Sequence, residues 1–447
     1  MKLKKYKLGD IAKIEISGVD KKTIEGETPV RLCNFVDVYY NWAITKEKAK
    51  SFMVASAKQT EIDKCSIGKG MVAITKDSET RDDIGVATYI ADDFEYVLLG
   101  YHCALITPNP AVVDGKYLNA FMHTRYIQKY FENNASGSGQ RYTLSNDTIG
   151  NIPVLIPSIE EQRTIGKVLA DIDRKIELNK LINDNLEAMA KQLYDYWFVQ
   201  FDFPNEDGKP YKSSGGAMAW NEKLKRKIPQ GWSNGILSDV ANITMGQSPD
   251  GSSYNEDGEG IIFYQGSTDF GLRFPDIRQY TTSPSRYANK GDILMSVRAP
   301  VGALNIANND CCIGRGLSAL SSKIGSMTHL YYLMNDFRLK FEGMNSAGTT
   351  FGSITKNELF SLPVIIPTKS VISEFEQVCE PIFYKQMIIG EEINALTKQR
   401  DELLPLLMNG QASVNYHLSL HLSNTMLYTL HYLGTVQNHV VRVLKII

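Results

Sequence analysis

An internal duplication limits what this chain of 447 residues can fold into more than any other feature. Residues 131–157 align with residues 341–367 at a constant offset of 210, without a gap, and seven of the 27 aligned positions are identical. Chance resemblance of two β-rich stretches is the weaker interpretation, because the match is gapless and includes prolines at the same places, such as Pro153 and Pro363. A repeat of this kind predicts two copies of one structural unit.

The beginnings of the two copies are also similar. The run LGDIAKI (8–14) resembles LSDVANI (237–243), and KGMVAI (69–74) resembles KGDILM (290–295). Alternating apolar runs predict strands in both copies. Helix-like stretches occur at 115–132 and 327–342, so we expect each copy to mix α and β structure.

A seven-residue apolar period follows each copy and predicts a long helix. The second of these stretches contains Pro381 and Gly390, which we expect to kink or interrupt its helix. An ordinary amphipathic core helix is the alternative, but about 40 residues is long compared with an average of 11–12. The residues that we expect to pair the helices are Ile165, Leu169, Ile172, Ile176, Leu186, Leu193, Phe375, Ile382, Ile389, Leu396 and Leu403.

These patterns divide the chain into six parts. A connector rich in Gly, Pro, Ser and charge separates the first helix from the second copy and is expected to be irregular. The predicted boundaries are 1–157 for the first domain, 158–200 for the central helix, 201–229 for the linker, 230–367 for the second domain, 368–412 for the distal helix and 413–447 for an atypical tail.

Composition excludes several classes of protein. Lys and Arg total 48 against 50 Asp and Glu, so the chain is no polybasic binder. No apolar run reaches the roughly 20 residues that a membrane helix needs, and no secretory signal opens the chain. The six Cys show no CxxC spacing, which indicates reduced core thiols in a cytoplasmic protein and predicts no metal site. Four of the seven His lie in the tail, at spacings that fit no standard metal site, and we assign the tail no role.

The sequence lacks the motifs of the common catalytic classes. It contains no GxxxxGK[ST] phosphate loop, no HExxH and no GxSxG. The nearest approach to the Asn/Asp-Pro-Pro-aromatic motif of adenine methyltransferases is ITPNPAVV (106–113), which is better interpreted as a turn. We therefore predict no catalytic residues on this chain.

With these features together, the chain resembles the specificity subunits of type I restriction–modification systems. The resemblance covers nearly all of residues 1–412, and its most specific part is a proline-bracketed strand followed by EEQRTIGKVLADIDRKIELNKLINDNLEAMAKQLYDYWF. The linker, including IPQGW (228–232), is also similar to that family. The tail after about residue 413 departs from the usual ending.

The resemblance implies an α/β (mixed α+β) fold with two tandem target-recognition domains, each followed by a long helix, the two helices pairing as an antiparallel coiled coil. Each domain would read one half of a split, asymmetric site in double-stranded DNA. Partners would be two methyltransferase (M) subunits and motor–endonuclease (R) subunits, with S-adenosylmethionine, ATP and Mg on those partners and no cofactor on this chain. A helix of about 40 residues at 1.5 Å per residue spans about 60 Å and could set the half-site spacing.

Candidate DNA contacts are the Lys, Arg, amide and hydroxyl side chains of loops at matching points of the repeat. Solvated surface charge is an equally good interpretation of any single residue. The candidates are Lys76, Ser78, Arg81, Ser138, Gln140, Arg141 and Tyr142 in the first domain and Gln265, Ser267, Arg273, Arg298, Arg315, Thr349 and Thr350 in the second.

Two other functions stay open from the sequence alone. A coiled-coil scaffold that binds only proteins would share the helices but read no DNA. A stand-alone methyltransferase or nuclease with a degenerate motif would require a cofactor site on this chain. Exchange of the first domain for a different one distinguishes the scaffold from a DNA reader, because only a DNA reader would change one half-site. Binding of S-adenosylmethionine by the isolated chain would support the stand-alone enzyme.

Overall fold

The computed structural model describes residues 2–138, 141–346 and 352–412, and these divide into two compact units. Among the described residues, the first unit extends to Glu177 and also takes in residues 394–412, and the second comprises Leu178–Ile393. Each unit therefore contains one of the two repeated domains and a part of each long helix.

The first unit contains a five-stranded sheet. Its strands, in spatial order, are β2 (Ala12–Ile16), β10 (Cys103–Pro108), β6 (Val72–Thr75), β8 (Ala87–Ile90) and β4 (Ala43–Ile44). Both faces of β6 and β8 are buried, and their runs VAIT and ATYI supply the apolar side chains that this requires. Helices α5 (Gly115–Met122) and α6 (Arg125–Asn134) contribute Tyr117, Phe121 and Phe131 to the same core.

The second unit repeats this sheet, which confirms the duplication. Strands β17 (Ala241–Met245), β25 (Leu317–Ser322), β22 (Ile293–Ser296) and β23 (Leu304–Ile306) follow the order of β2, β10, β6 and β8. Helix α10 (Met327–Ser346) takes the place of α5 and α6. In the first unit the predicted helix over 115–132 is divided at His123 and Thr124, so one expected helix is two.

The proline-bracketed runs close both domains in the same way. The run IPVLIP forms β13 (Pro153–Ile156), which pairs antiparallel with the first strand, β1 (Lys4–Lys7). The run LPVIIP forms β26 (Pro363–Ile366), which pairs with β16 (Ser233–Ile236) in the same sense. The short helices that accompany these strands are α1 (Leu8–Ile11), α7 (Asn146–Gly150), α9 (Leu237–Val240) and α11 (Lys356–Phe360).

The two domains differ in what is added to the shared sheet. The first adds α2 (Phe35–Tyr39), α3 (Lys46–Ala49), α4 (Gln59–Cys65) and the sheets β5 (Met53–Ala57), β3 (Thr28–Cys33), β9 (Val97–Leu99) and β11 (Ser136–Ser138), β12 (Arg141–Thr143), β7 (Asp77–Ser78). The second adds one sheet of β18 (Tyr254–Asn255), β20 (Tyr280–Thr281), β19 (Ile261–Tyr264), β24 (Cys311–Ile313) and β21 (Tyr287–Ala288). A common frame thus carries two unlike sets of additions.

The first long helix, α8 (Ile159–Tyr194), begins at a capping box and continues into a π-helical turn, Asp195–Val199. The backbone N–H of Glu161 donates to Ser158 Oγ at 3.4 Å, and the Ser158 N–H donates to Glu161 Oε2 at 3.1 Å. Gln162 is fully buried and its Nε2 donates to the carbonyls of Val112 and Pro157, both at 3.0 Å. These bonds tie the start of the helix to the first domain.

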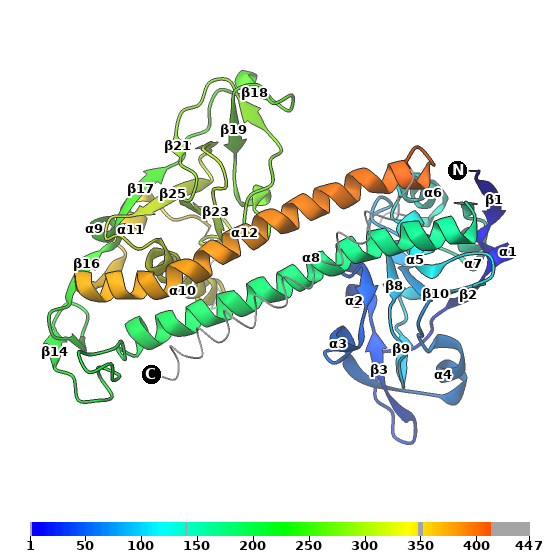
Figure 1. Cartoon of the computed structure of the whole chain (residues 1–447), viewed down its shortest axis with the longest axis horizontal. Helices are drawn as coiled ribbons and strands as arrows, with labels where there is room; N and C mark the ends of the chain where they lie inside the picture. Colours follow the sequence, from blue (N-terminus) through cyan, green and yellow to red (C-terminus); the bar gives the residue numbers. More distant parts are fainter. Residues whose placement is uncertain (1, 139–140, 347–351, 413–447) are drawn as a thin grey trace. The chain divides into compact units, whose positions relative to one another are not determined.

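The second long helix, α12, runs over Lys369–Met408, so the expected interruption at Pro381 or Gly390 is wrong, and Figure 1 shows that the continuous helix is bent. Pro381 lies on the exposed side, where water can satisfy the carbonyl whose partner N–H is missing. Gly390 is buried against Phe274, and a Cβ there would lie 2.7 Å from the Phe274 ring. This glycine therefore permits close packing on the helix and does not end it.

The two helices pair antiparallel within each unit. In the first, Arg400 Nη1 lies 3.6 Å from Asp173 Oδ1. In the second, Asn179 Nδ2 donates to Glu392 Oε2 and Gln386 Nε2 donates to Glu187 Oε2, both at 2.8 Å. Residue numbers rise on α8 as they fall on α12, which is the antiparallel register. Among the predicted pairing residues, Leu403 is half-buried and the others are buried.

The linker is more ordered than the sequence predicts. Strands β14 (Met218–Asn221) and β15 (Arg226–Pro229) form a hairpin within it. Asn221 Oδ1 accepts the backbone N–H groups of Lys223 and Leu224, which closes the turn. The sequence did not predict this hairpin, because the segment is rich in Gly, Ser and charge and has no apolar periodicity. Hydrogen bonds from the backbone to a side chain stabilise its turn instead.

Candidate nucleic-acid interface

The candidate residues of the first domain meet where β7 and β12 pair. In this register Tyr142 lies opposite Ser78, and Thr143 lies opposite Asp77. The guanidinium carbon of Arg81 lies 5.0 Å from the centre of the Tyr142 ring, a cation–π distance. Arg81 and Arg141 are both exposed, so this edge presents two arginines to solvent.

A buried carboxylate, Asp77, organises that edge. Its Oδ2 lies 2.9 Å from Lys76 Nζ, 2.8 Å from His102 Nδ1 and 3.0 Å from Arg141 Nη2. The Asp77 side chain is 8% exposed, whereas that of Arg141 is 56% exposed. Burial alone would raise the Asp77 pKa, but hydrogen bonds from His102, Lys76, Thr143 and Arg141 outweigh it and hold the pKa well below its ordinary value.

The Nδ1 atom of His102 has two close contacts that cannot both be hydrogen bonds. It lies 2.8 Å from Asp77 Oδ2 and also 2.8 Å from Arg141 Nη2. If Nδ1 carries a proton, it donates to Asp77 and faces Arg141 donor to donor. If Nδ1 is bare, it accepts from Arg141 and faces the carboxylate acceptor to acceptor. Only one of these two contacts of His102 is a hydrogen bond at a time, whereas Arg141 Nη2 can donate to Asp77 in either case.

The candidates of the second domain meet at the ends of β19, β22 and β25. The Val297 N–H donates to the Gly316 carbonyl at 2.9 Å, which places Arg298 beside the turn that carries Arg315. A Cβ on Gly316 would lie 2.8 Å from the Gln265 carbonyl oxygen, so glycine allows this turn to approach Gln265 closely. Gln265, Arg298 and Arg315 are all exposed, and Ser267 is half-buried.

The two edges occupy equivalent places in the repeated sheet but differ in the side chain at one matching position. Asp77 pairs with Thr143, and Arg298 forms a bridge with Ser353, which is 210 residues beyond Thr143. The preceding strand pairs agree with this match. Thr75, two residues before Asp77, pairs with Cys103, and Ser296, two residues before Arg298, pairs with Leu317. An anion in the first domain thus has a cation as its counterpart in the second.

Two of the predicted DNA contacts lie inside the protein. Arg273 is 6% exposed: its Nη1 donates to Glu187 on α8 at 3.1 Å and its Nη2 donates to Gln386 on α12 at 3.2 Å. Lys76 is 8% exposed and its Nζ is bound to Asp77. Burial prevents both from reaching DNA directly, and both have a charged or polar partner instead.

The remaining predictions have no structural test. Gln140, Thr349 and Thr350 and the tail over 413–447 lie outside the described residues. Ser138 belongs to β11, which pairs with β12 and so adjoins the same edge. Sequence reasoning missed Asp77 and His102: Asp77 was within a candidate loop but an acidic residue gives no DNA signal, and His102 is distant in sequence.

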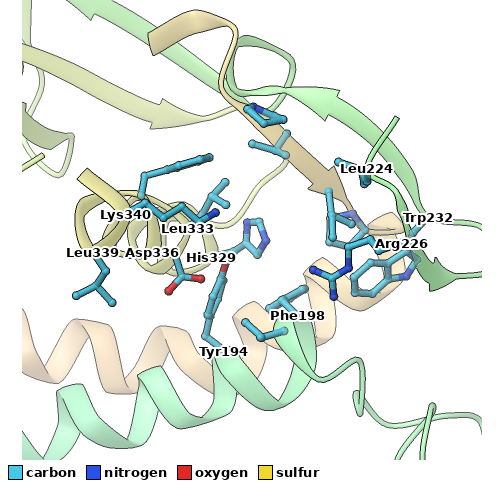
Figure 2. A pocket seen from close by; sticks show the side chains of 16 residues that line it. Tyr194, Phe198, Leu224, Arg226, Trp232, His329, Leu333, Asp336, Leu339 and Lys340 are labelled. Carbon is cyan, nitrogen blue, oxygen red and sulfur yellow. The ribbon is translucent and has the colours of Figure 1, made fainter. Parts of the chain in front are cut away.

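A separate pocket of about 610 Å³ lies in the second unit, among the end of α8, α10 and β26 (Figure 2). Its aromatic lining includes Tyr194, Phe198 and Trp232, and Figure 2 shows His329 among them. His329 is 2% exposed, and its Nδ1 has no hydrogen-bond partner among the residues that the structure describes. Burial lowers the pKa of His329 to about 3.

We expect His329 to make the protein acid-sensitive. The unfolded chain protonates this histidine near its ordinary pKa of 6.5, while the folded chain does not until about pH 3. Its contribution to stability is therefore present above pH 6.5 and is lost as pH falls below it, by about 2 kcal/mol between pH 7 and pH 5. Urea unfolding followed by tryptophan fluorescence should show a smaller loss over this range in His329→Phe. An equal loss in both proteins would contradict the prediction.

Within the described ranges, no group of three or more His, Cys, Asp or Glu side chains is placed to hold a metal ion. The same part of the chain has no helix that is both long and apolar enough to cross a lipid bilayer. All six cysteines are buried, and none of them forms a disulfide.

Comparison with known proteins identifies the repeated domains. Residues 2–188 and 229–399 each match the family described as the type I restriction modification DNA specificity domain. The chain belongs to this family. The two matches fall on the two halves of the duplication, and each includes much of a long helix, so the DNA specificity domain of this family comprises both the recognition fold and its helix.

Individual relatives match most of the chain. The chain is 29% identical over 374 residues to a Methanocaldococcus jannaschii protein named as the type I restriction enzyme MjaX specificity subunit, covering 81% of this chain and 83% of that one. It is 22% identical over 406 residues to the type I restriction enzyme HindI specificity subunit of Haemophilus influenzae, covering 75% and 85%. The crystal structure of the type I restriction–modification S subunit from M. genitalium superposes with a TM-score of 0.56 at 15% identity, over 91% of this chain and 96% of that one, and shows the same fold.

Proposed function

We propose that this chain is the DNA sequence-specificity subunit of a type I restriction–modification complex, and that each of its domains reads one half of a split, asymmetric site in double-stranded DNA. The observation that carries the proposal is the presence of two DNA specificity domains in one chain. The unlike side chains at equivalent positions of the two domains, a buried Asp77 and an exposed Arg298, support different half-sites.

The paired helices supply the geometry that the proposal needs. Reading two half-sites usually takes a two-fold dimer whose shape fixes the spacing. Here a tandem repeat takes the place of the dimer, and α8 and α12 separate the readers and set the half-site spacing. Their exposed faces are the proposed seats of two methyltransferase subunits. Leu181 and Tyr384, which are 54% and 65% exposed, are apolar side chains available there.

In this proposal, catalysis belongs to the partners. The chain itself is non-catalytic, and its methyltransferase partners bind S-adenosylmethionine, flip the target adenine out of the duplex and methylate N6. Motor–endonuclease subunits bind ATP and Mg. Because the chain has a formal charge of −2, the partners must also supply much of the affinity for phosphates.

The deciding experiment exchanges residues 1–157 for the corresponding domain of another family member, in the assembled complex with its methyltransferase. This segment contains both β1 and β13, so the exchange keeps their hydrogen-bonded pair together. We expect methylation mapping to show one half-site changed and the other half-site and the spacing retained.

Two other outcomes contradict the proposal. If the exchange leaves the methylated sequence unchanged, the domains bind only proteins and the chain is a coiled-coil scaffold without DNA readout. If the complex of the unaltered chain methylates DNA without regard to sequence, no specificity resides in this subunit. An equivalent exchange of residues 230–367 is the matched control and should change only the opposite half-site.

A further inference from the structure

The edge built around Asp77 has the features of a base-reading site. Arg141 projects from a short strand, is 56% exposed, and is held at one nitrogen, Nη2, by a carboxylate that is 8% exposed. A guanidinium has five N–H donors, so an arginine fixed at one nitrogen still presents donors to a ligand. Bidentate pairing of arginine with guanine O6 and N7 is the commonest specific contact in the major groove.

Positioning is the property that separates Arg141 from an ordinary surface arginine. A free arginine loses side-chain entropy when it binds, whereas one already oriented by a buried partner loses less. Asp77 can provide this orientation because it is itself held by Lys76 Nζ at 2.9 Å and by the pairing of β7 with β12. The ion pair between Arg141 and Asp77 is direct and part-buried.

Exposed side chains of both signs lie at this edge, namely Arg81 and Arg141 and the carboxylates of Glu79, Asp82 and Asp83. Lys76 and Arg141 share the single carboxylate of Asp77, so this cluster of three side chains carries one positive charge in excess. Guanine presents two acceptors, O6 and N7, on one edge, so it can accept hydrogen bonds from an arginine whose Nη2 stays bound to Asp77.

We propose, resting on the proposed function, that Arg141 contacts a guanine in the half-site of the first domain and that Asp77 is the positioning residue that orients it. Arg141 then determines one base of the recognition sequence. Asp77 acts through Arg141 and does not touch the base.

The test uses the assembled complex with its methyltransferase and a set of DNA duplexes that carry each of the four bases at every position of both half-sites. Arg141→Lys keeps the charge but removes the planar fork. We expect it to reduce discrimination for guanine at one position of one half-site by about 5- to 150-fold, with the other half-site unchanged. Arg125→Lys, on the exposed surface of α6, is the matched control and should leave every position unchanged.

Asp77→Asn tests the positioning role. We expect it to weaken discrimination at the same position as Arg141→Lys, because the guanidinium loses its charged partner. A role confined to folding predicts a different result: lower melting temperature and uniformly weaker binding, without a change in base preference. That result would contradict the proposed role of Asp77 in orienting Arg141.

The failures are distinguishable. If Arg141→Lys weakens binding equally for all sequences and lowers the slope of affinity against salt, Arg141 contacts phosphate and the inference is overturned. If discrimination is unchanged, the inference is overturned and the proposed function stands. If the unaltered complex shows no base preference anywhere, the proposed function itself fails.

Discussion

Leu169→Ala should lower the free energy of unfolding by about 2–5 kcal/mol. Leu169 lies on the buried face of α8 and is fully buried. It belongs to the core cluster that includes Tyr117 of the first domain and Leu404 and Leu407 of α12. Truncation removes apolar contacts at the point where both helices and the domain meet, and a packed core relaxes only partly around the cavity.

The control for this prediction lies twelve residues along the same helix. Leu181 is 54% exposed, so Leu181→Ala makes the same chemical change where no core contact is lost. We expect its effect to stay within about 0.5 kcal/mol. Urea unfolding monitored by circular dichroism measures both. Similar losses in the two variants would show that burial of the helix seam does not stabilise the unit.

Arg273→Ala should be the second large effect, with a loss of about 2–4 kcal/mol. Arg273 bonds Glu187 and Gln386 and its guanidinium lies 5.2 Å and 5.0 Å from the ring centres of Tyr331 and Phe383. Removing it leaves the fully buried Gln386 and the part-buried carboxylate of Glu187 without their charged partner.

The matched control is Arg286→Ala, an exposed arginine of the same domain, for which we expect a change within about 0.5 kcal/mol. Arg273→Met separates packing from charge, because it keeps an unbranched apolar stem and removes the guanidinium. Thermal or urea unfolding compares the three. If Arg273→Ala proves no more destabilising than Arg286→Ala, the buried network contributes nothing to the stability of the second unit. We expect Arg273→Ala to affect stability more than discrimination between DNA sequences, because Arg273 faces the helices.

The fold was largely predictable because its main features are periodic. A repeat at an offset of 210 requires two similar frames, and the shared order of β2, β10, β6 and β8 with β17, β25, β22 and β23 is the result. The seven-residue apolar period likewise requires one buried face on each long helix. Where the prediction failed, at Gly390, a local breaker was outweighed by a tertiary contact with Phe274.

The candidate site was less predictable, because the charge of a residue does not determine whether its side chain is buried or exposed. Arg273 and Arg298 are the same residue type in neighbouring loops, yet one is 6% exposed and pairs with two helices while the other faces solvent. Asp77, which organises the edge of the first domain, carries no signal for DNA binding in a sequence.

The amino-acid sequence by itself determined the duplication, the mixed α and β character of each copy, the two long helices and the face by which each is buried, because periodic burial of apolar side chains is written directly in residue order. Only the tertiary structure decided which cations are free to meet a ligand and which are neutralised. His102 and Arg141 lie 25 and 64 residues from Asp77 in the chain, and the fold brings both to the carboxylate that Lys76 also binds. That convergence depends on three-dimensional distances that no local pattern encodes.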